Sequence, residues 1–207
     1  MAKGREQLIS TAVQLFAERG LDGVSLAEIN RAAGQKNATA AHYHFGGKQG
    51  LVQAIFDKHR SRVNQLRQQM LASLPANADL PEIVRTLVVP LAEQVRDPDG
   101  GCHYLRFLAQ LMNNPRLPRD QLDQTDSEVL AELFRRFELV LSGMREAAAE
   151  SGADSSNLRM EFVISMVFNS LASYADRVAR EGLDESRHSL TVDQLVAAAT
   201  GALQADT

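Results

Sequence analysis

The sequence predicts an all-α protein with two parts: an N-terminal three-helix unit over residues 3–62 and a helical body over residues 63–207. Three observations lead to this prediction. Apolar residues recur at helical spacing along most of the chain. No segment shows the alternating pattern of a strand, and glycine or proline separates the helical segments. Such a chain is expected to fold by packing helices on helices.

Charge is distributed unevenly between the two parts. The whole chain has a formal net charge of −4. Residues 1–60 hold eight Lys and Arg against five Asp and Glu, a net charge of +3, which leaves −7 for the remainder. A basic module on an acidic body favours nucleic-acid binding by the first part. Chance unevenness in a short segment is the alternative.

Composition narrows the class of protein further. No apolar run approaches the roughly 20 residues that a membrane span requires, and the first residues show no signal-peptide core. We therefore expect a cytoplasmic protein with no membrane partner. The single Cys102 excludes an internal disulfide and a cysteine-cluster zinc site. A small buried hydrophobe is favoured there over a free reactive thiol.

Three helices are predicted before residue 46. The first has one apolar face and ends at Gly20. Ser25, with Glu28 three residues later, predicts a capping box at the start of the second. Asn37 is the expected N-cap of a third helix over residues 38–44. Two short helices joined by a tight turn, on a supporting helix, form a helix-turn-helix.

The third helix has a composition that suits contact with DNA. Its small residues let the backbone approach base edges, which Thr39 and His42 are expected to face. Tyr43 and Lys48 are expected to contact phosphate. His44 is expected to pack inward, so that His42 and His44 make no metal site. The predicted DNA-contacting residues are Ser25, Lys36, Asn37, Thr39, His42, Tyr43 and Lys48.

The stretch Arg5–Leu51 resembles the TetR family of bacterial regulators. The matching positions are Arg5, Ala12, Leu15, Phe16, Gly20, Gly23, Ser25, Ile29, Ala33, Gly34, Tyr43, His44, Phe45, Lys48 and Leu51. The ending Tyr43-His44-Phe45-Gly46 is similar to one branch of that family. The turn Gln35-Lys36-Asn37 departs from its usual Val-Ser, and His42 stands where its common tyrosine falls. The resemblance implies a two-domain helical fold and a dimeric repressor.

The body is expected to be a series of helices. Their ranges are 48–73, 81–95, 102–113, 127–149 and 156–180, with a last helix capped by Thr191. Pro90 is expected to kink or shorten the second of them, and residues 117–124 to be irregular or a short helix. In the resembling family the last two helices pair between two copies, which implies a homodimer. Their apolar faces could instead pack the monomer core.

Methionines and aromatic residues are concentrated in the body, with five of the six methionines beyond residue 69. A mostly apolar cavity with a few polar groups is the usual form of a small-molecule site. We therefore expect a lipophilic ligand, with Arg106 binding a carboxylate or other acceptor on it. A plain helical core is the alternative, favoured residue by residue. The predicted pocket residues are His59, His103, Arg106, Phe107, Phe137, Met166 and Asn169.

The sequence contains no enzyme motif. A phosphate-binding glycine loop, a nucleophile elbow and a His-Glu-x-x-His motif are all missing. We therefore expect no catalytic residue, cofactor or metal. The predicted function is a transcription regulator on a palindromic operator, which the resemblance makes a repressor released by a small molecule. The alternatives are a regulator without an inducer and a dimer that no longer binds DNA.

Overall fold

The computed structural model describes residues 2–37, 39–113, 128–148 and 153–205. Regular structure in these ranges is entirely helical, which confirms the predicted fold class. The elements are α1 (Ala2–Arg19), α2 (Leu26–Ala32), α3 (Ala40–Phe45), α4 (Lys48–Ser73), α5 (Leu80–Ala92), the 3-10 helix η1 (Glu93–Arg96), α6 (Gly101–Met112), α8 (Glu128–Ala148), α9 (Ala153–Glu181) and α10 (Glu185–Gln204).

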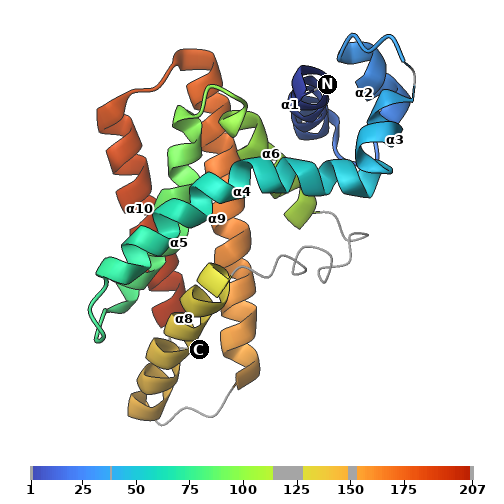
Figure 1. Cartoon of the computed structure of the whole chain (residues 1–207). Coiled ribbons are helices and arrows are strands. Elements are labelled where there is room, and N and C mark those ends of the chain that lie inside the picture. Colours follow the sequence, from blue (N-terminus) through green and yellow to red (C-terminus); the bar gives the residue numbers. More distant parts are fainter. Residues whose placement is uncertain (1, 38, 114–127, 149–152, 206–207) are drawn as a thin grey trace.

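Helices α1, α2 and α3 form a head at one end of the molecule, and α4 runs from this head into the body (Figure 1). The 26 residues of α4 span roughly 39 Å at 1.5 Å per residue. In the body, α6 packs against α9 and also against α1, while α10 packs against α5 and α9. The expected domain boundary at residue 62 lies within α4. That division stays a prediction.

Polar caps determine where two of the helices begin. The Ser25 hydroxyl accepts a hydrogen bond from the Glu28 amide, and the Glu28 carboxylate accepts one from the Ser25 amide, so the predicted capping box is present. Asp79 and Glu82 form a second capping box at the start of α5. Each box satisfies two amides that a helix start leaves without intrahelical partners.

The predicted start of the third helix is wrong. Helix α3 begins at Ala40 with Thr39 as its N-cap, and Ala38 lies outside the described residues. Asn37 forms a turn instead, because its side-chain oxygen accepts hydrogen bonds from the Thr39 amide at 2.9 Å and the Thr39 hydroxyl at 2.8 Å. An asparagine that bonds the backbone two residues ahead favours a turn over helix initiation.

The predicted start of the last helix is also wrong. Asp184 caps α10, since its carboxylate accepts a hydrogen bond from the Arg187 amide at 2.7 Å. Thr191 lies inside the helix, and its hydroxyl donates to the Arg187 carbonyl. An earlier cap next to the turn at Gly182 therefore determines the start.

Pro90 does not end α5, which continues for two residues to Ala92 before the chain tightens into η1. The segment expected as one helix over residues 81–95 is therefore an α-helix followed by a 3-10 helix. A 3-10 turn is a common ending for an α-helix. The expected irregular segment 117–124 lies outside the described residues.

A continuous apolar core joins the head to the body. The ring of Phe107 in α6 stacks on Phe16 in α1, with ring centroids 5.9 Å apart. It also packs against Phe56 in α4 at 5.8 Å. All three side chains are buried. The head is thus held by packing as well as by the chain connection through α4.

Candidate DNA-binding surface and regulatory body

The crossing of α2 and α3 is fixed by a side chain that the sequence did not single out. Asn30 is 3% exposed, and its side-chain oxygen accepts a hydrogen bond from the Ala41 amide at 2.9 Å. Ala40 and Ala41 are buried, so that α3 lies close to α2. This hydrogen bond satisfies an amide at the start of α3 and sets the orientation of its outer face.

The outer face of α3 carries the predicted contact residues. His42 is exposed and Tyr43 is 77% exposed. His44 is half-buried between two rings, 5.3 Å from Tyr43 and 6.1 Å from Phe45 between centroids. The side chains of His42 and His44 thus differ in exposure, in line with the outward and inward roles expected for them.

The turn before α3 lies beside this outer face. Lys36, Asn37 and Thr39 are all exposed. The Thr39 hydroxyl donates to Asn37 and keeps its lone pairs free to accept a further hydrogen bond. Five of the seven positions named for DNA contacts form an exposed strip within residues 36–43: Lys36, Asn37, Thr39, His42 and Tyr43. Ala40 and Ala41 in this range are buried, and residue 38 lies outside the described residues.

Ser25 and Glu28 form a charged cap at the start of α2. The Ser25 hydroxyl donates to Glu28 and accepts from its amide. Hydrogen bonds from the Ser25 backbone and hydroxyl, with the charge of Arg19, lower the pKa of Glu28 to about 2. The hydroxyl of Ser25 is thus engaged in capping, and its contact with DNA stays a prediction.

The start of α4 provides both a cation and backbone amides. Gly47 precedes the helix without a side-chain cap, so the first amides of α4 are donors without a cap in the part of the chain described. The Lys48 ammonium lies 5.7 Å from the centroid of the Phe16 ring. A side chain at Gly50 would place its Cβ 1.8 Å from the Phe45 carbonyl oxygen, so α3 and α4 approach closely there.

Most residues predicted for a ligand pocket contact other protein groups, but both ring nitrogens of His59 and Nδ1 of His103 are buried without a hydrogen-bond partner among the described residues. His59 is buried and stacks on Tyr104, with ring centroids 4.4 Å apart. Burial lowers the pKa of His59 to about 4, against the opposing effect of Asp97. Phe107 fills the junction between head and body, and burial lowers the pKa of half-buried His103.

The remaining predicted pocket residues are also engaged. Arg106 forms an ion pair with Asp176 of α9 at 3.0 Å. Asn169 accepts a hydrogen bond from the Asn113 side chain at 2.8 Å. Phe137 and Met166 belong to the apolar core or pack against it. These contacts suit the alternative of a plain core, and the pocket stays a prediction.

A groove of about 380 Å³ lies between α4 and α5. Its lining residues are Gln69, Met70, Ser73, Leu74, Glu82, Arg85 and Thr86. None of the seven predicted pocket residues is among them.

Within the described ranges, no group of three His, Cys, Asp or Glu residues could hold a metal ion. No helix over the described residues has the length and apolar character to cross a membrane.

Residues 8–55 match the model of the bacterial regulatory proteins of the tetR family. The chain is 28% identical over 89 residues to the HTH-type transcriptional regulator AcrR of Shigella flexneri. It is 34% identical over 116 residues to the HTH-type transcriptional regulator BetI of Rhizobium meliloti (strain 1021). These matches cover 43% and 56% of this chain, and 40% and 55% of the two relatives, so they span about half of each protein.

The fold is similar to that of solved regulators over nearly its whole length. The fatty acid degradation regulator FadR from Bacillus halodurans superposes with a TM-score of 0.57 and 17% identity, covering 94% of this chain and 97% of that one. At this identity the likeness concerns the fold alone. Both curated relatives are transcription regulators, as expected for a chain without an enzyme motif.

Proposed function

We propose that this chain, whose residues 8–55 match the bacterial regulatory proteins of the tetR family, is a DNA-binding transcription regulator of that family acting in the cytoplasm. The observation that carries the proposal is the exposed outer face of α3, held against α2 by Asn30. A short helix held in this way can enter the major groove while its supporting helices remain outside.

Bases are read from the exposed strip over residues 36–43. Thr39 and His42 carry hydrogen-bonding groups on side chains that the fold leaves exposed. Ala40 and Ala41 are buried where α3 meets α2, whereas Thr39 and His42 are exposed. Hydrogen bonds to base edges then select the sequence.

Phosphate contacts orient the helix on the duplex. Tyr43 and Lys36 are exposed at the two ends of the strip, and Lys48 begins α4 beside uncapped amides. A lysine together with helix N-terminal amides binds phosphate through charge and hydrogen bonds. The positive charge of residues 1–60 adds a contribution that does not depend on sequence.

Two copies are proposed to pair through α9 and α10. Only part of each apolar face of these two helices is free to pair. The residues buried in the monomer are Val163, Val167, Leu171, Tyr174, Leu195, Val196 and Ala199. Phe162 of α9 is 70% exposed, and Ala198 and Ala202 of α10 are exposed. Pairing through this outer set would place two α3 helices in successive major grooves of a palindromic site, roughly 34 Å apart.

Repression with release by a small lipophilic ligand is the proposed regulation. A ligand that binds better to a conformation in which the two heads are not spaced for successive major grooves lowers the DNA-bound population. The pocket residues named from the sequence are the candidate contacts, with the ion pair of Arg106 to Asp176 as a contact that an anionic ligand must replace. A thermal-shift screen in which apolar ligands never stabilise the protein would contradict this regulation.

The test of DNA binding is a gel-shift titration on the DNA upstream of the gene for this chain, repeated at several salt concentrations. The proposal predicts a specific complex that survives excess unrelated DNA.

Lys48→Ala should weaken binding to operator and unrelated DNA alike, and lower the salt slope by about one for each phosphate that the protein no longer neutralises. As a control, Arg135→Ala removes an exposed cation from α8 in the body and should change neither the affinity for DNA nor the salt slope. A Lys48→Ala protein that changes sequence preference instead contradicts the phosphate role.

A further inference from the structure

The short segment between α5 and α6 contacts both the last helix and α4, the helix that leads into the head. It consists of η1, the loop 97–100 and Gly101, and we name it the 93–101 segment. Its two ends face different parts of the molecule: Glu93 and Arg96 face α10, and Asp97 and Asp99 face α4. The segment therefore joins the helix proposed to pair two copies to the helix that leads into the head.

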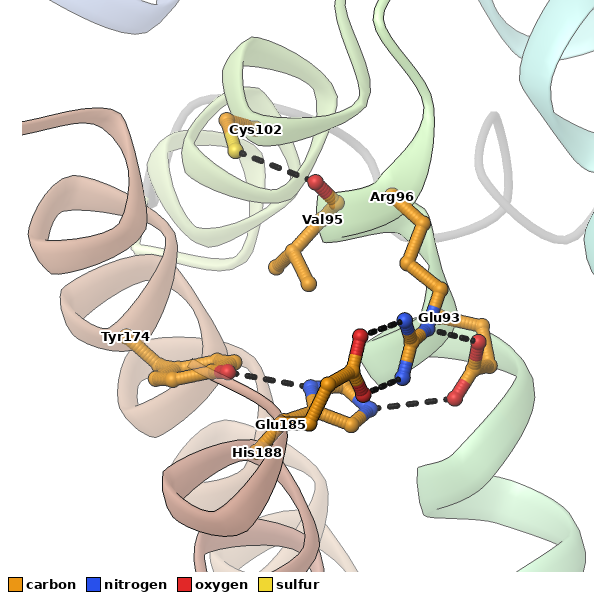
Figure 2. A network of polar contacts seen from close by, with 7 residues as sticks. All are labelled: Glu93, Val95, Arg96, Cys102, Tyr174, Glu185 and His188. Atoms are coloured by element: carbon orange, nitrogen blue, oxygen red, sulfur yellow. Dashed lines mark hydrogen bonds and ion pairs between the residues drawn. The ribbon is translucent and has the colours of Figure 1, made fainter. Parts of the chain in front are cut away.

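On the α10 side, the segment is held by a network of charged groups (Figure 2). Arg96 donates to both carboxylate oxygens of Glu185, at 2.5 and 2.6 Å, and to Glu93 at 2.6 Å. Glu93 also lies 3.0 Å from Nε2 of buried His188, whose Nδ1 lies 3.0 Å from the Tyr174 hydroxyl. A bidentate pair within a network gives a fixed geometry that an isolated surface ion pair lacks.

On the head side, the loop is tied to α4, and through α4 to α1. Asp97 lies 3.1 Å from the Arg62 guanidinium and 3.6 Å from Nδ1 of buried His59. The Lys58 ammonium donates to the Asp99 carbonyl and to the Ser10 hydroxyl of α1, each at 3.3 Å. One lysine thus contacts the loop and the first helix of the head.

The loop between these two sets of contacts is tightly constrained. A Cβ at Gly101 would lie 1.9 Å from the Gln94 carbonyl oxygen, so η1 and the start of α6 approach too closely for any other residue. Gly100 has a φ of 107°, and a Cβ there would lie 3.6 Å from Val13 of α1. The Asp97 carboxylate also accepts a hydrogen bond from the Asp99 amide. A shift of α10 would therefore move the whole segment, and with it α4, instead of being taken up by a change of shape within the loop.

We propose that the 93–101 segment positions the DNA-binding head relative to α10, with Arg96 as the positioning residue. For its consequence on DNA the inference rests on the proposed function. If two copies pair through α10, the distance between their heads depends on this connection, and Arg96 limits which half-site spacings the dimer accepts. The competing account is that the apolar packing of Phe16 on Phe107 alone holds the head.

The chain offers a matched control. Arg85 of α5 also pairs with an acid of α10, Asp193, at 2.8 Å, and is exposed to a similar degree as Arg96, but it lies outside the 93–101 segment. Arg96→Gln and Arg85→Gln therefore each remove one ion pair to α10, and only the first removes an ion pair of the segment. Glu185→Gln removes the acidic partner of the Arg96–Glu185 ion pair and replaces Arg96→Gln in the experiment if that variant does not fold.

The first measurement is hydrogen exchange of the full chain without DNA. Arg96→Gln should raise exchange of amides in residues 97–104 and in α1 by roughly two- to fivefold, the range that loss of an exposed ion pair allows. Arg85→Gln should raise exchange only near its own ion pair. Equal effects of both variants, or an Arg96→Gln effect confined to η1 and α10, would overturn the proposal.

The second measurement is binding to operators whose half-sites are moved apart or together by one base pair at a time. The wild-type and Arg85→Gln proteins should share one sharp optimum, and Arg96→Gln should bind neighbouring spacings with affinities closer to that optimum. An unchanged spacing profile overturns the role in spacing. If the wild-type protein binds no DNA, the proposed function fails, while the exchange measurement still decides whether the segment positions the head.

Discussion

At the scale of single residues, the inner and outer sides of α3 have different tasks. Asn30 and Ala41 fix the inner side through one buried hydrogen bond. Thr39 and His42 are exposed, and their side chains are the ones proposed to contact base edges. Because the two sides are separate, contacts with bases can change without disturbing the fold of the head.

Thr39→Ala and His42→Ala should each alter sequence preference. Removal of a hydrogen bond to a base should cost about 1–3 kcal/mol of binding free energy at particular base pairs and little elsewhere. Selection of bound sequences from a random library, followed by titration of single base-pair variants, measures this. Tyr43→Phe, which removes a hydroxyl from a predicted phosphate contact, should weaken all sequences similarly. Recovery of the wild-type consensus by both alanine variants would rule out the base-reading role.

His59 should make the stability of the fold depend on pH. Its pKa is lowered to about 4 by burial, against an ordinary value near 6.5. Between these two values the unfolded chain binds a proton that the native state does not, so the free energy of unfolding falls as pH is lowered through this window. Urea titrations from pH 7 to pH 4 should show this decrease.

His59→Leu should reduce that slope. An identical pH dependence in wild-type and His59→Leu proteins would mean that other groups produce it. His103, whose pKa burial also lowers, is the first of these to test.

At the scale of helices, local patterns predicted most elements, and competition between local signals explains the errors. The Ser25 and Glu28 spacing predicted the start of α2 because both hydrogen bonds form within four residues. Asn37 and Thr191 are also good cap residues by type. Thr39 and Asp184 are the N-caps instead, since the Asn37 side chain closes a turn onto Thr39 and the Asp184 carboxylate accepts the Arg187 amide.

Phe107 shows what periodicity cannot reveal. The helical pattern of α6 correctly indicated that Phe107 faces inward, but its neighbours Phe16 and Phe56 lie on α1 and α4. Phe107, one of the residues expected to line a ligand pocket, packs at the junction of head and body. Which element covers an apolar face depends on tertiary packing that a single helix does not encode.

Phe107→Ala should destabilise the protein by about 3–5 kcal/mol, because it removes a buried ring from the middle of three packed helices. Chemical denaturation monitored by circular dichroism measures this. Phe134→Ala on α8, where the side chain is 40% exposed, should cost much less. Similar destabilisation of both variants would contradict a core that runs from head to body.

At the scale of the whole molecule, the contacts that join distant elements were not predictable from the sequence. Arg96 and Glu185 are 89 residues apart in the chain, and nothing in either local pattern connects them. The positive charge of residues 1–60 and the negative charge of the remainder, in contrast, are visible in the sequence alone. Composition thus indicates what the parts do, and only the fold shows how they are held together.

Pairing of two copies through α9 and α10 can be tested with charge on the exposed face. Phe162→Glu should weaken the dimer at least tenfold, because a carboxylate would be buried in an apolar interface. Leu139→Glu on α8, at a side chain that is 57% exposed, should leave association unchanged. Analytical ultracentrifugation over a range of concentrations measures both. A Leu139→Glu protein that no longer dimerises, beside a Phe162→Glu protein that does, would assign the interface to α8.

The central claim is that two copies of this chain read a palindromic DNA site through α3. Selection of bound sequences from random duplex DNA with the purified full chain tests it most directly. The account predicts an inverted repeat whose half-sites are centred about one helical turn, roughly 34 Å, apart. Enrichment of a single unpaired half-site, or of no sequence at a salt concentration where the protein is folded, would contradict it.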